Sequence, residues 1–399
     1  MTTSRHDVVV VGAGIAGLSC ARALAADGHD VVVLEAQTQV GGRVATEQVD
    51  GFLVDRGFQV LNPAYPHLRR RVDMHRLGLR RFPREVRVRT LDGLAEVSDP
   101  SRRPDRLPRS LRSGLVRAGD VAALAAVARA AAGADLTRRE VFDRAGFTTP
   151  LRHQVVDPFL AGVVCEQDGS TSARFTAWLL AMFAAGTPGL PSGGMATLPR
   201  IMAEDLDVRL GTRVEALDPA TASLNTSEGD FSARAVVIAA GPLEAARLEG
   251  TEPVAVHATR SFWFATHRAP SHSPAIHLDG TGSGPVATTT VVSHLAPEYA
   301  PAGEHLVAAL TVGESADEHQ VRDHLGLVYG ADPADWRLVR EHHVPVTVPA
   351  VGPGAHRAGA GVRIVQRTIT CGDQFGNASL DGAAASGRRA AREALNLLR

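Results

Sequence analysis

The sequence contains no lysine, because all 42 of its basic residues are arginine. Lysine supplies the amine that forms Schiff bases and, at a lowered pKa, a nucleophile or general base. Its absence excludes every mechanism in which an amine of a lysine side chain takes part.

Cysteine is scarce. Cys20, Cys165 and Cys371 lie far apart and are odd in number, so we expect no disulfide framework. The sequence has no Cys-X-X-Cys pair and no cluster of histidine with cysteine. We therefore predict no metal site.

Long apolar runs and an excess of charge are missing as well. No stretch of 18 apolar residues could span a bilayer, and the few residues before Val8 do not resemble a signal peptide. The net charge of −1 gives no overall field that would recruit nucleic acid or acidic substrates. With 399 residues, 44% of them hydrophobic, the chain can bury more than one core. These features predict a soluble, cytoplasmic enzyme of two domains.

A glycine-rich turn near the start is the first positive feature. Four valines at 8–11 predict a buried parallel strand, because they are apolar on both faces and β-branched. Gly12 permits a tight turn, Gly14 lets the backbone approach a pyrophosphate, and Gly17 lets a helix pack against the strand. The N-terminal amides of that helix would face the phosphates. The pattern predicts a dinucleotide site, with an ordinary βαβ turn as the alternative.

The next segment specifies the nucleotide. A second strand at 31–34 ends at Glu35, whose carboxylate can accept hydrogen bonds from both ribose hydroxyls and would repel the extra phosphate of NADP. Gly41 and Gly42 allow a second close backbone approach, and Arg43 offers a fork of donors for phosphate or flavin oxygens. Together these residues favour FAD over NAD.

A second glycine-rich segment lies near the other end of the chain. After Gly372, Asp373 can accept hydrogen bonds from ribityl hydroxyls. Asp381, Gly382 and Ala383 open a helix whose positive end would stabilise charge on a reduced flavin. The alternative is that Asp381 only caps a C-terminal helix. We predict that both ends of the chain build one FAD site.

These motifs, together with others in the same order, resemble the superfamily of FAD-dependent amine oxidases, protoporphyrinogen oxidases and phytoene desaturases. The further motifs are Val-Asp-Arg-Gly-Phe-Gln-Val at 54–60, Leu-Pro-Ser-Gly-Gly-Met-Ala-Thr-Leu-Pro at 190–199, the strand at Val214, and the apolar segment 235–242. The resemblance covers nearly the whole length. Together, the motifs and the resemblance imply these cofactor-binding residues: Gly12, Gly14, Ile15, Ala16, Gly17, Glu35, Ala36, Gly41, Gly42, Arg43, Gly57, Phe58, Val214, Ala240, Gly372, Asp373, Ser379, Leu380 and Ala383.

Two departures from the superfamily concern its amine oxidases. Many of them use a lysine near the flavin N5 atom, and this chain has none. Ser379 stands where they carry an aromatic residue of a substrate cage. Both departures count against a typical primary-amine oxidase.

The order of the motifs predicts an α/β fold with two interleaved domains. A Rossmann-like FAD-binding domain would comprise residues 1–65, 190–250 and 355–399. A discontinuous α+β substrate domain would comprise residues 66–189 and 251–354.

Within the substrate domain, strands are expected at 260–265 and 306–312. Apolar residues between 174 and 183 would suit a substrate cavity, with ordinary core as the alternative. The helix expected at 121–132 is core or cavity wall in preference to a membrane anchor. The arginine-dense stretch 69–117 could bind anionic lipid headgroups or an acidic substrate, although a solvated surface is favoured.

Three residues are candidates for proton transfer. His342 and His343 precede the segment 344–349, which in the superfamily leads past the substrate pocket to the flavin. Glu166 follows the apolar segment 160–165, which looks like another pocket-side element of the superfamily. A structural role is the alternative for each.

We predict an enzyme with noncovalent FAD, because Cys371 is not placed like the thioether cysteine of covalent relatives. It would transfer a hydride from an apolar organic substrate of small or medium size to flavin N5, in a desaturation or dehydrogenation. Oxidation of a secondary or tertiary amine is one alternative, and a flavin-dependent isomerase or mutase without net redox change is another. Oxygen or a quinone would accept the electrons, and peripheral membrane contact is not favoured.

Overall fold

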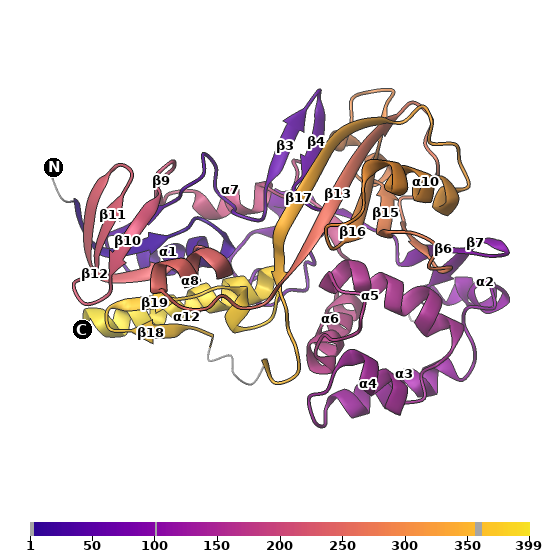
Figure 1. The fold of residues 1–399 in the computed structure, drawn as a ribbon, viewed down its shortest axis with the longest axis horizontal. Coiled ribbons are helices and arrows are strands. Elements are labelled where there is room, and N and C mark those ends of the chain that lie inside the picture. The colour runs from indigo at the N-terminus through magenta and orange to yellow at the C-terminus, as the bar shows by residue number, and fades with distance from the viewer. Residues whose placement is uncertain (1–3, 100–101, 356–360) are drawn as a thin grey trace.

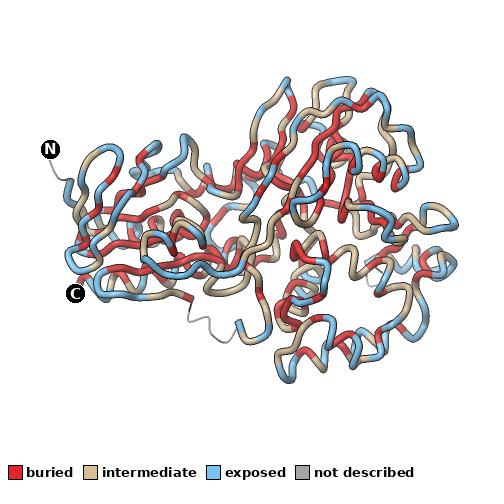
Figure 2. The backbone as a smooth tube through the Cα atoms, viewed as in Figure 1, coloured by how far each residue is buried: buried red, intermediate tan, exposed pale blue. Residues whose placement is uncertain are grey.

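The computed structural model describes residues 4–99, 102–355 and 361–399. Two sheet-containing parts lie side by side along the long axis, and both termini lie at the outer end of the first part (Figure 1). Buried residues follow the strands of both sheets (Figure 2). The largest apolar cluster joins Val10 and Leu24 of the first part to Trp263 and Leu306 of the second, so the two parts share a core.

The first sheet has eight strands in the order β10-β11-β12-β1-β2-β9, with β19 beside β12 and β18 beside β19. Its central pairs are parallel, whereas β10, β11 and β18 pair antiparallel with their neighbours. The strands are β1 (Ser4–Val11), β2 (Val31–Leu34), β9 (Asp207–Arg209), β10 (Val214–Asp218), β11 (Ser223–Thr226), β12 (Gly229–Ile238), β18 (Arg363–Val365) and β19 (Thr368–Thr370).

β1 lies between β12 and β2, and its residues Val8, Val9 and Val10 are fully buried. The run of valines forms a central strand because both of its faces are covered. The helices of this part are α1 (Ile15–Ala26), α7 (Thr197–Ala203), α8 (Pro242–Glu249) and α12 (Leu380–Leu398). Helix α12 packs tightly on α1, since a Cβ atom at Gly387 would lie 1.9 Å from the Ala16 carbonyl oxygen. This contact brings the C-terminal segment to the turn after β1.

The second sheet has seven strands in the order β17-β13-β16-β15-β14-β6-β7. Its pairs are antiparallel except for β14 with β6. The strands expected at 260–265 and 306–312 lie within two of its long central strands. The bounds are β6 (Glu85–Thr90), β7 (Gly93–Ser98), β13 (Val256–Thr266), β14 (Ile276–Asp279), β15 (Val286–Val291), β16 (His305–Val312) and β17 (Arg337–Pro349), and helix α10 (Glu318–Tyr329) packs on β14, β15 and β6.

Helices of the segment 102–190 gather beside the second sheet (Figure 1). They are α2 (Leu107–Arg112), α3 (Asp120–Ala131), α4 (Arg138–Arg144), α5 (Asp157–Val164) and α6 (Ala173–Ala185), with a π-helical stretch at Leu151–Val156. The helix expected at 121–132 is α3, which buries Val127 and Ala131 in a cluster with Phe142 and Phe147. Helix α3 is therefore part of a helical core, which is one of the two roles expected for it.

Short elements complete the chain. Two small sheets pair β3 (Thr46–Val49) with β4 (Phe52–Asp55) and β5 (Arg80–Arg81) with β8 (Gly189–Leu190). The remaining helical turns are α9 (Val292–Leu295) and 3-10 turns at Met74–Leu77, Pro104–Arg106, Pro297–Tyr299 and Asp373–Phe375. The predicted domain boundaries stay a prediction, and residues 356–360 of the third FAD piece lie outside the described residues.

In the part of the chain that the structure describes, no helix combines the length and the apolar character needed to cross a membrane. Over the same residues, His, Cys, Asp and Glu side chains form no group of three or more that could hold a metal ion.

Candidate active site

The turn after β1 depends on two glycines that touch other backbone. Gly12 has a φ of +102°, and a Cβ atom there would lie 2.6 Å from the Ala239 carbonyl oxygen. A Cβ atom at Gly17 would lie 1.9 Å from the Gly12 carbonyl oxygen. Gly17 does not line the cavity described below, so its role is the close packing of α1 against β1.

Gly14 differs from these two glycines. It is the N-cap of α1 and provides no side-chain cap. The nearest atom to a Cβ at this position is the Gly41 carbonyl oxygen, 4.0 Å away, so the space above it is open. The amides of the first turn of α1 consequently lie open to an anionic group.

Glu35 follows β2 and is buried. Its carboxylate accepts hydrogen bonds from the Ala13 amide at 2.7 Å and from the Gln37 amide at 2.9 Å. These bonds fix the carboxylate beside the glycine turn, and a carboxylate has further lone pairs for ribose hydroxyls.

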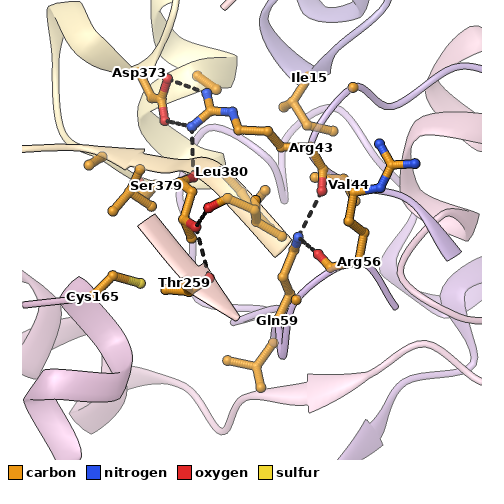
Figure 3. Close-up of a pocket in the computed structure, with 18 of the residues that line it drawn as sticks. Ile15, Arg43, Val44, Arg56, Gln59, Cys165, Thr259, Asp373, Ser379 and Leu380 are labelled. Carbon is orange, nitrogen blue, oxygen red and sulfur yellow. Dashed lines mark hydrogen bonds and ion pairs between the residues drawn. The ribbon is translucent and has the colours of Figure 1, made fainter. Parts of the chain in front are cut away.

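Arg43 and Asp373 form a two-pronged ion pair, shown in Figure 3. The guanidinium donates to the carboxylate at 2.6 and 2.9 Å, and also to the Thr347 carbonyl oxygen at 3.0 Å. Burial lowers the pKa of Arg43 and the Asp373 carboxylate raises it, with a net upward shift. The pair therefore joins the beginning and the end of the chain through a charge-assisted contact.

Helix α12 begins at the same place. Its N-cap Ser379 accepts a hydrogen bond from the Gly382 amide at 3.0 Å. Asp381 accepts hydrogen bonds from the amides of His67 and Leu68 at 2.7 and 3.2 Å, and burial raises the pKa of its carboxyl group. Asp381 thus ties α12 to residues after β4, while the cap is made by Ser379.

A cavity of about 1170 Å³ connects these groups. Of the predicted cofactor-binding residues, it is lined by Gly12, Gly14, Ile15, Ala16, Glu35, Ala36, Gly41, Gly42, Arg43, Gly57, Phe58, Val214, Ala240, Gly372, Asp373, Ser379, Leu380 and Ala383. The structure therefore brings segments separated by more than 300 positions in the sequence around one space.

The cavity continues into the second part of the molecule as an apolar arm. The arm's apolar lining consists of Val60, Phe82, Val86, Val97, Phe159, Val163, Leu179, Phe183, Ile276 and Leu310. Leu179 and Phe183 come from the apolar region expected near a substrate, whereas Phe175 of that region is buried in the core. Sequence analysis missed the contributions of β6 and β7, because nothing in their local pattern points to a cavity.

The three predicted proton-transfer candidates occupy different surroundings. His342 lines the cavity and is buried. Its Nε2 lies 3.3 Å from Glu47 Oε1 and has no hydrogen-bond partner among the described residues, and its Nδ1 lies 3.5 Å from Ser261 Oγ. His343 also lines the cavity but is half exposed, and its Nε2 lies 2.7 Å from Glu314 Oε1.

Glu166 does not line the cavity. Its carboxylate accepts hydrogen bonds from Arg138 at 2.9 Å and from the Gly169 amide at 2.6 Å. Arg138 also contacts Asp157 at 2.6 Å. The structure therefore places Glu166 in a buried ion-pair network of the helical region, apart from the other two candidates.

The sequence profile of the family described as flavin containing amine oxidoreductase matches residues 15–395. The chain belongs to this family. The predicted superfamily and the predicted Rossmann-like α/β fold are thereby confirmed, the cofactor is FAD, and the protein is an FAD-dependent oxidoreductase.

Curated relatives of this flavin amine oxidoreductase match over short segments. The putrescine oxidase of Kocuria rosea is 47% identical over 83 residues, which are 21% of this chain and 17% of that protein. A putative flavin-containing monoamine oxidase, AofH, of Mycobacterium tuberculosis is 51% identical over 57 residues, 14% of this chain and 13% of that protein. The matches thus span less than a fifth of these two relatives.

Solved structures match over nearly the whole chain and show the fold. A putrescine oxidase bound to putrescine has a TM-score of 0.70 at 20% identity, covering 99% of this chain and 100% of that one. A putative protoporphyrinogen oxidase from Exiguobacterium has a TM-score of 0.75 at 17% identity with the same coverage. A reduced UDP-galactopyranose mutase has a TM-score of 0.69 at 15% identity, covering 98% and 96%.

The residues of the cavity fit FAD. The open N-terminus of α1 and the Arg43 guanidinium would hold the pyrophosphate, and Glu35 would hold the adenosine ribose. Asp373 would face the ribityl chain, and the first turn of α12 would face the flavin ring.

Proposed function

We propose that the protein removes a hydride from a carbon of an apolar organic substrate, in a desaturation or dehydrogenation, with noncovalent FAD as the immediate acceptor. The apolar arm that continues from the nucleotide cradle supports this most strongly. Such an arm binds apolar surface through the hydrophobic effect, at about 25 cal/mol per Å² buried. It also keeps water away from the reacting carbon.

A residue of the chain must accept one proton from the substrate. When bound, FAD takes up a hydride and hence both electrons of a C–H bond. A substrate that becomes unsaturated must also lose a proton from the neighbouring atom, which requires a base.

We propose His342 as that base. Its ring is buried, with Nε2 3.3 Å from the Glu47 carboxylate and Nδ1 3.5 Å from Ser261 Oγ, and a neutral imidazole has one nitrogen lone pair with which to accept a proton. Burial lowers the pKa of His342, and the neighbouring Glu47 opposes the shift. The imidazole is therefore neutral at pH 7 and able to accept a proton.

Oxidation of a secondary or tertiary amine is the second candidate. The family and the similarity to a putrescine oxidase favour it. The same arm could hold the apolar part of such an amine, with the reacting C–H bond next to nitrogen. The lack of any lysine still argues against the primary-amine oxidases that depend on one.

Anaerobic mixing tests the proposal. The purified protein, expected to be yellow, is mixed with polyenes, porphyrinogens and amines while the flavin absorption is followed. Bleaching by a polyene or porphyrinogen supports desaturation, and bleaching by amines alone supports the second candidate. Conversion of a substrate without net consumption of oxygen or a quinone would contradict both and favour an isomerase. We propose oxygen as the acceptor that reoxidises the cofactor, and a quinone as the alternative.

A further inference from the structure

Three consecutive threonines on β15 differ in what their hydroxyl groups contact. Thr289 Oγ1 donates to the Ala308 carbonyl oxygen at 2.7 Å and lies 3.0 Å from the Tyr329 hydroxyl oxygen. Thr290 Oγ1 lies 3.1 and 3.3 Å from two backbone carbonyl oxygens. The Thr288 hydroxyl, by contrast, forms no hydrogen bond with any of the described residues.

Thr288 is nonetheless enclosed by the protein. Its exposed fraction is 5%, yet it lines the cavity, whereas Thr289 and Thr290 do not. A hydroxyl group can donate one hydrogen bond and accept two, and burying one without a partner costs free energy. The cavity is the side from which a partner can reach this hydroxyl.

A β-bulge turns Thr288 toward the cavity. Val286 pairs with Thr311 of β16, but Thr288 pairs with Leu310, so β15 has one extra residue at this point. In a regular strand, Thr288 would share a face with Val286, which lies in an apolar core cluster. The bulge instead places Thr288 on the face of Leu310, which lines the cavity.

Helix α5 leaves room for this side chain. Gly162 of α5 also lines the cavity, and a Cβ atom there would lie 2.5 Å from Thr288 Cγ2 and 3.0 Å from Thr288 Oγ1. A larger residue at this position would therefore crowd the threonine. The glycine keeps the hydroxyl accessible from the cavity.

The register of the sheet relates Thr288 to the proposed base. Leu310 pairs with Ser261 of β13, and Ser261 pairs with His342 of β17. The four residues thus form one row across four antiparallel strands, and residues directly opposite each other project from the same face. Three strand spacings separate Thr288 from His342, which is roughly 14 Å. The apolar side chain of Leu310 lies between them in the row.

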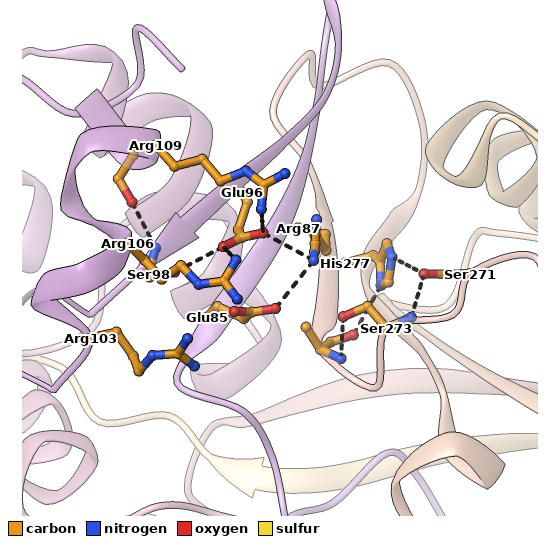
Figure 4. A network of polar contacts seen from close by, with 12 residues as sticks. Glu85, Arg87, Glu96, Ser98, Arg103, Arg106, Arg109, Ser271, Ser273 and His277 are labelled. Carbon is orange, nitrogen blue, oxygen red and sulfur yellow. Dashed lines mark hydrogen bonds and ion pairs between the residues drawn. The ribbon is translucent and has the colours of Figure 1, made fainter. Parts of the chain in front are cut away.

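Polar groups of the neighbouring strands β6, β7 and β14 contact one another, as Figure 4 shows. Arg87 lies 3.3 Å from Glu85 and 3.1 Å from Glu96. His277, which pairs with Thr289, has its Nε2 atom 3.1 Å from a serine hydroxyl. Arg87, Glu96 and His277 do not line the cavity, so they provide no counter-charge for a ligand beside Thr288.

We infer that Thr288 forms a hydrogen-bond subsite for an uncharged oxygen atom of the substrate, as in a hydroxyl or carbonyl group. A charged group would lose its hydration there without a counter-charge. The substrate is then an apolar molecule whose oxygen substituent lies about three strand spacings from the position that loses the proton. This inference rests on the proposed function, since it assumes that the apolar arm holds the substrate and that His342 is the base.

Anaerobic calorimetric titration of the FAD-loaded protein tests the subsite without turnover, and the flavin spectrum shows that the cofactor stays oxidised. The probes are toluene, benzyl alcohol and benzoate, which share one ring and differ in the substituent. In a purely apolar arm, toluene would bind most tightly, because the hydroxyl of benzyl alcohol would lose its hydrogen bonds to water. We expect benzyl alcohol to bind at least as tightly as toluene, and benzoate at least about tenfold more weakly.

Three variants locate the effect. Thr288→Val keeps the shape of the side chain and removes the hydroxyl, so the affinity for benzyl alcohol should fall about tenfold while that for toluene does not fall. Thr288→Ser keeps the hydroxyl and should keep the wild-type order of affinities. Thr290→Val removes a hydroxyl of the same strand that does not line the cavity, and it should leave both affinities unchanged.

Three results would overturn the subsite. They are tighter binding of toluene or benzoate than of benzyl alcohol by the wild-type protein, no binding of any probe, and a Thr288→Val variant in which benzyl alcohol loses no more affinity than toluene. The wild-type series decides the sign even if a variant does not fold. Failure of every compound to bleach the flavin, with the affinity for benzyl alcohol intact, would instead contradict the proposed function alone.

Discussion

The two ends of the cavity are built by different means. At the nucleotide end, backbone atoms and contiguous motifs make the contacts, with glycines that pack against carbonyl oxygens and an ion pair at 2.6 and 2.9 Å. At the substrate end, single side chains from separate elements meet, as where Arg84 lies 2.9 Å from Thr187 Oγ1 and 3.3 Å from Asp99. Each motif of the first end is local in sequence, although the motifs come from distant parts of the chain, whereas the second end is assembled from single residues by tertiary packing. Side-chain changes should therefore alter specificity at the second end and cofactor retention at the first.

The largest effect should come from Gly17→Val. Its Cβ would lie 1.9 Å from the Gly12 carbonyl oxygen, so α1 cannot stay where it is. We expect a loss of about 3 kcal/mol or more in the free energy of unfolding, together with loss of FAD. Thermal unfolding and the flavin spectrum measure both. Gly119→Val is the control, because no atom lies within 4 Å of its Cβ. A soluble yellow Gly17→Val protein would disprove the rigid contact.

Gly14→Val should abolish FAD binding without destabilising the fold. The nearest atom to its Cβ is 4.0 Å away and its φ is −75°, so a valine fits the backbone. The side chain would occupy the space above the N-terminus of α1, where the pyrophosphate is expected. We predict a melting temperature of the FAD-free protein close to that of wild type and no detectable FAD binding in a fluorescence titration. Wild-type FAD affinity would refute the assigned site.

His342→Gln should slow the reaction without changing the binding of FAD. We expect the rate of flavin reduction to fall by about 100-fold, the usual size of a lost general base, with unchanged FAD affinity. His319→Gln, at an exposed histidine of α10, serves as the control.

The pH profile of flavin reduction gives an independent test of His342. Burial lowers its pKa, so the neutral ring persists through pH 7 and the rate should fall only as the pH drops below about 6.5. This acidic limb should vanish in His342→Gln. An unchanged limb in the variant would assign the titration to another group.

Glu35→Ala should give the smallest effect. It removes the acceptor for the ribose and leaves the Ala13 and Gln37 amides without their partner. We expect FAD to bind about tenfold more weakly, the equivalent of one or two hydrogen bonds, while affinity for substrate analogues is retained. Equilibrium dialysis measures the change, with the exposed Glu252→Ala as control. An equal loss of substrate affinity would show that the two ends are coupled.

The nucleotide end could be predicted from the sequence because its chemistry is local. A strand, three spaced glycines and an acidic residue specify the geometry within about one βαβ unit. The predicted residues line one cavity, apart from Gly17, whose close packing is also a property of that local unit.

The substrate end could not be predicted in this way. Arg84 and Glu85 line the cavity although they lie in an arginine-rich stretch whose sequence favours a solvated surface, and Glu96 in the same stretch is buried among three guanidinium groups. Glu166 follows a segment that resembles a pocket-side element, but its carboxylate contacts Arg138 of helix α4 in a buried ion-pair network. In each case the deciding partner comes from a different element, and spacing along the chain carries no information about it.

The ion pair between Arg43 and Asp373 also bears on how the protein is made. The two residues are 330 positions apart, so during synthesis the glycine turn leaves the ribosome long before its partner exists. The newly made first half therefore lacks both the Asp373 carboxylate and α12, and the two halves of the cavity wall meet only after the C-terminal segment has been made.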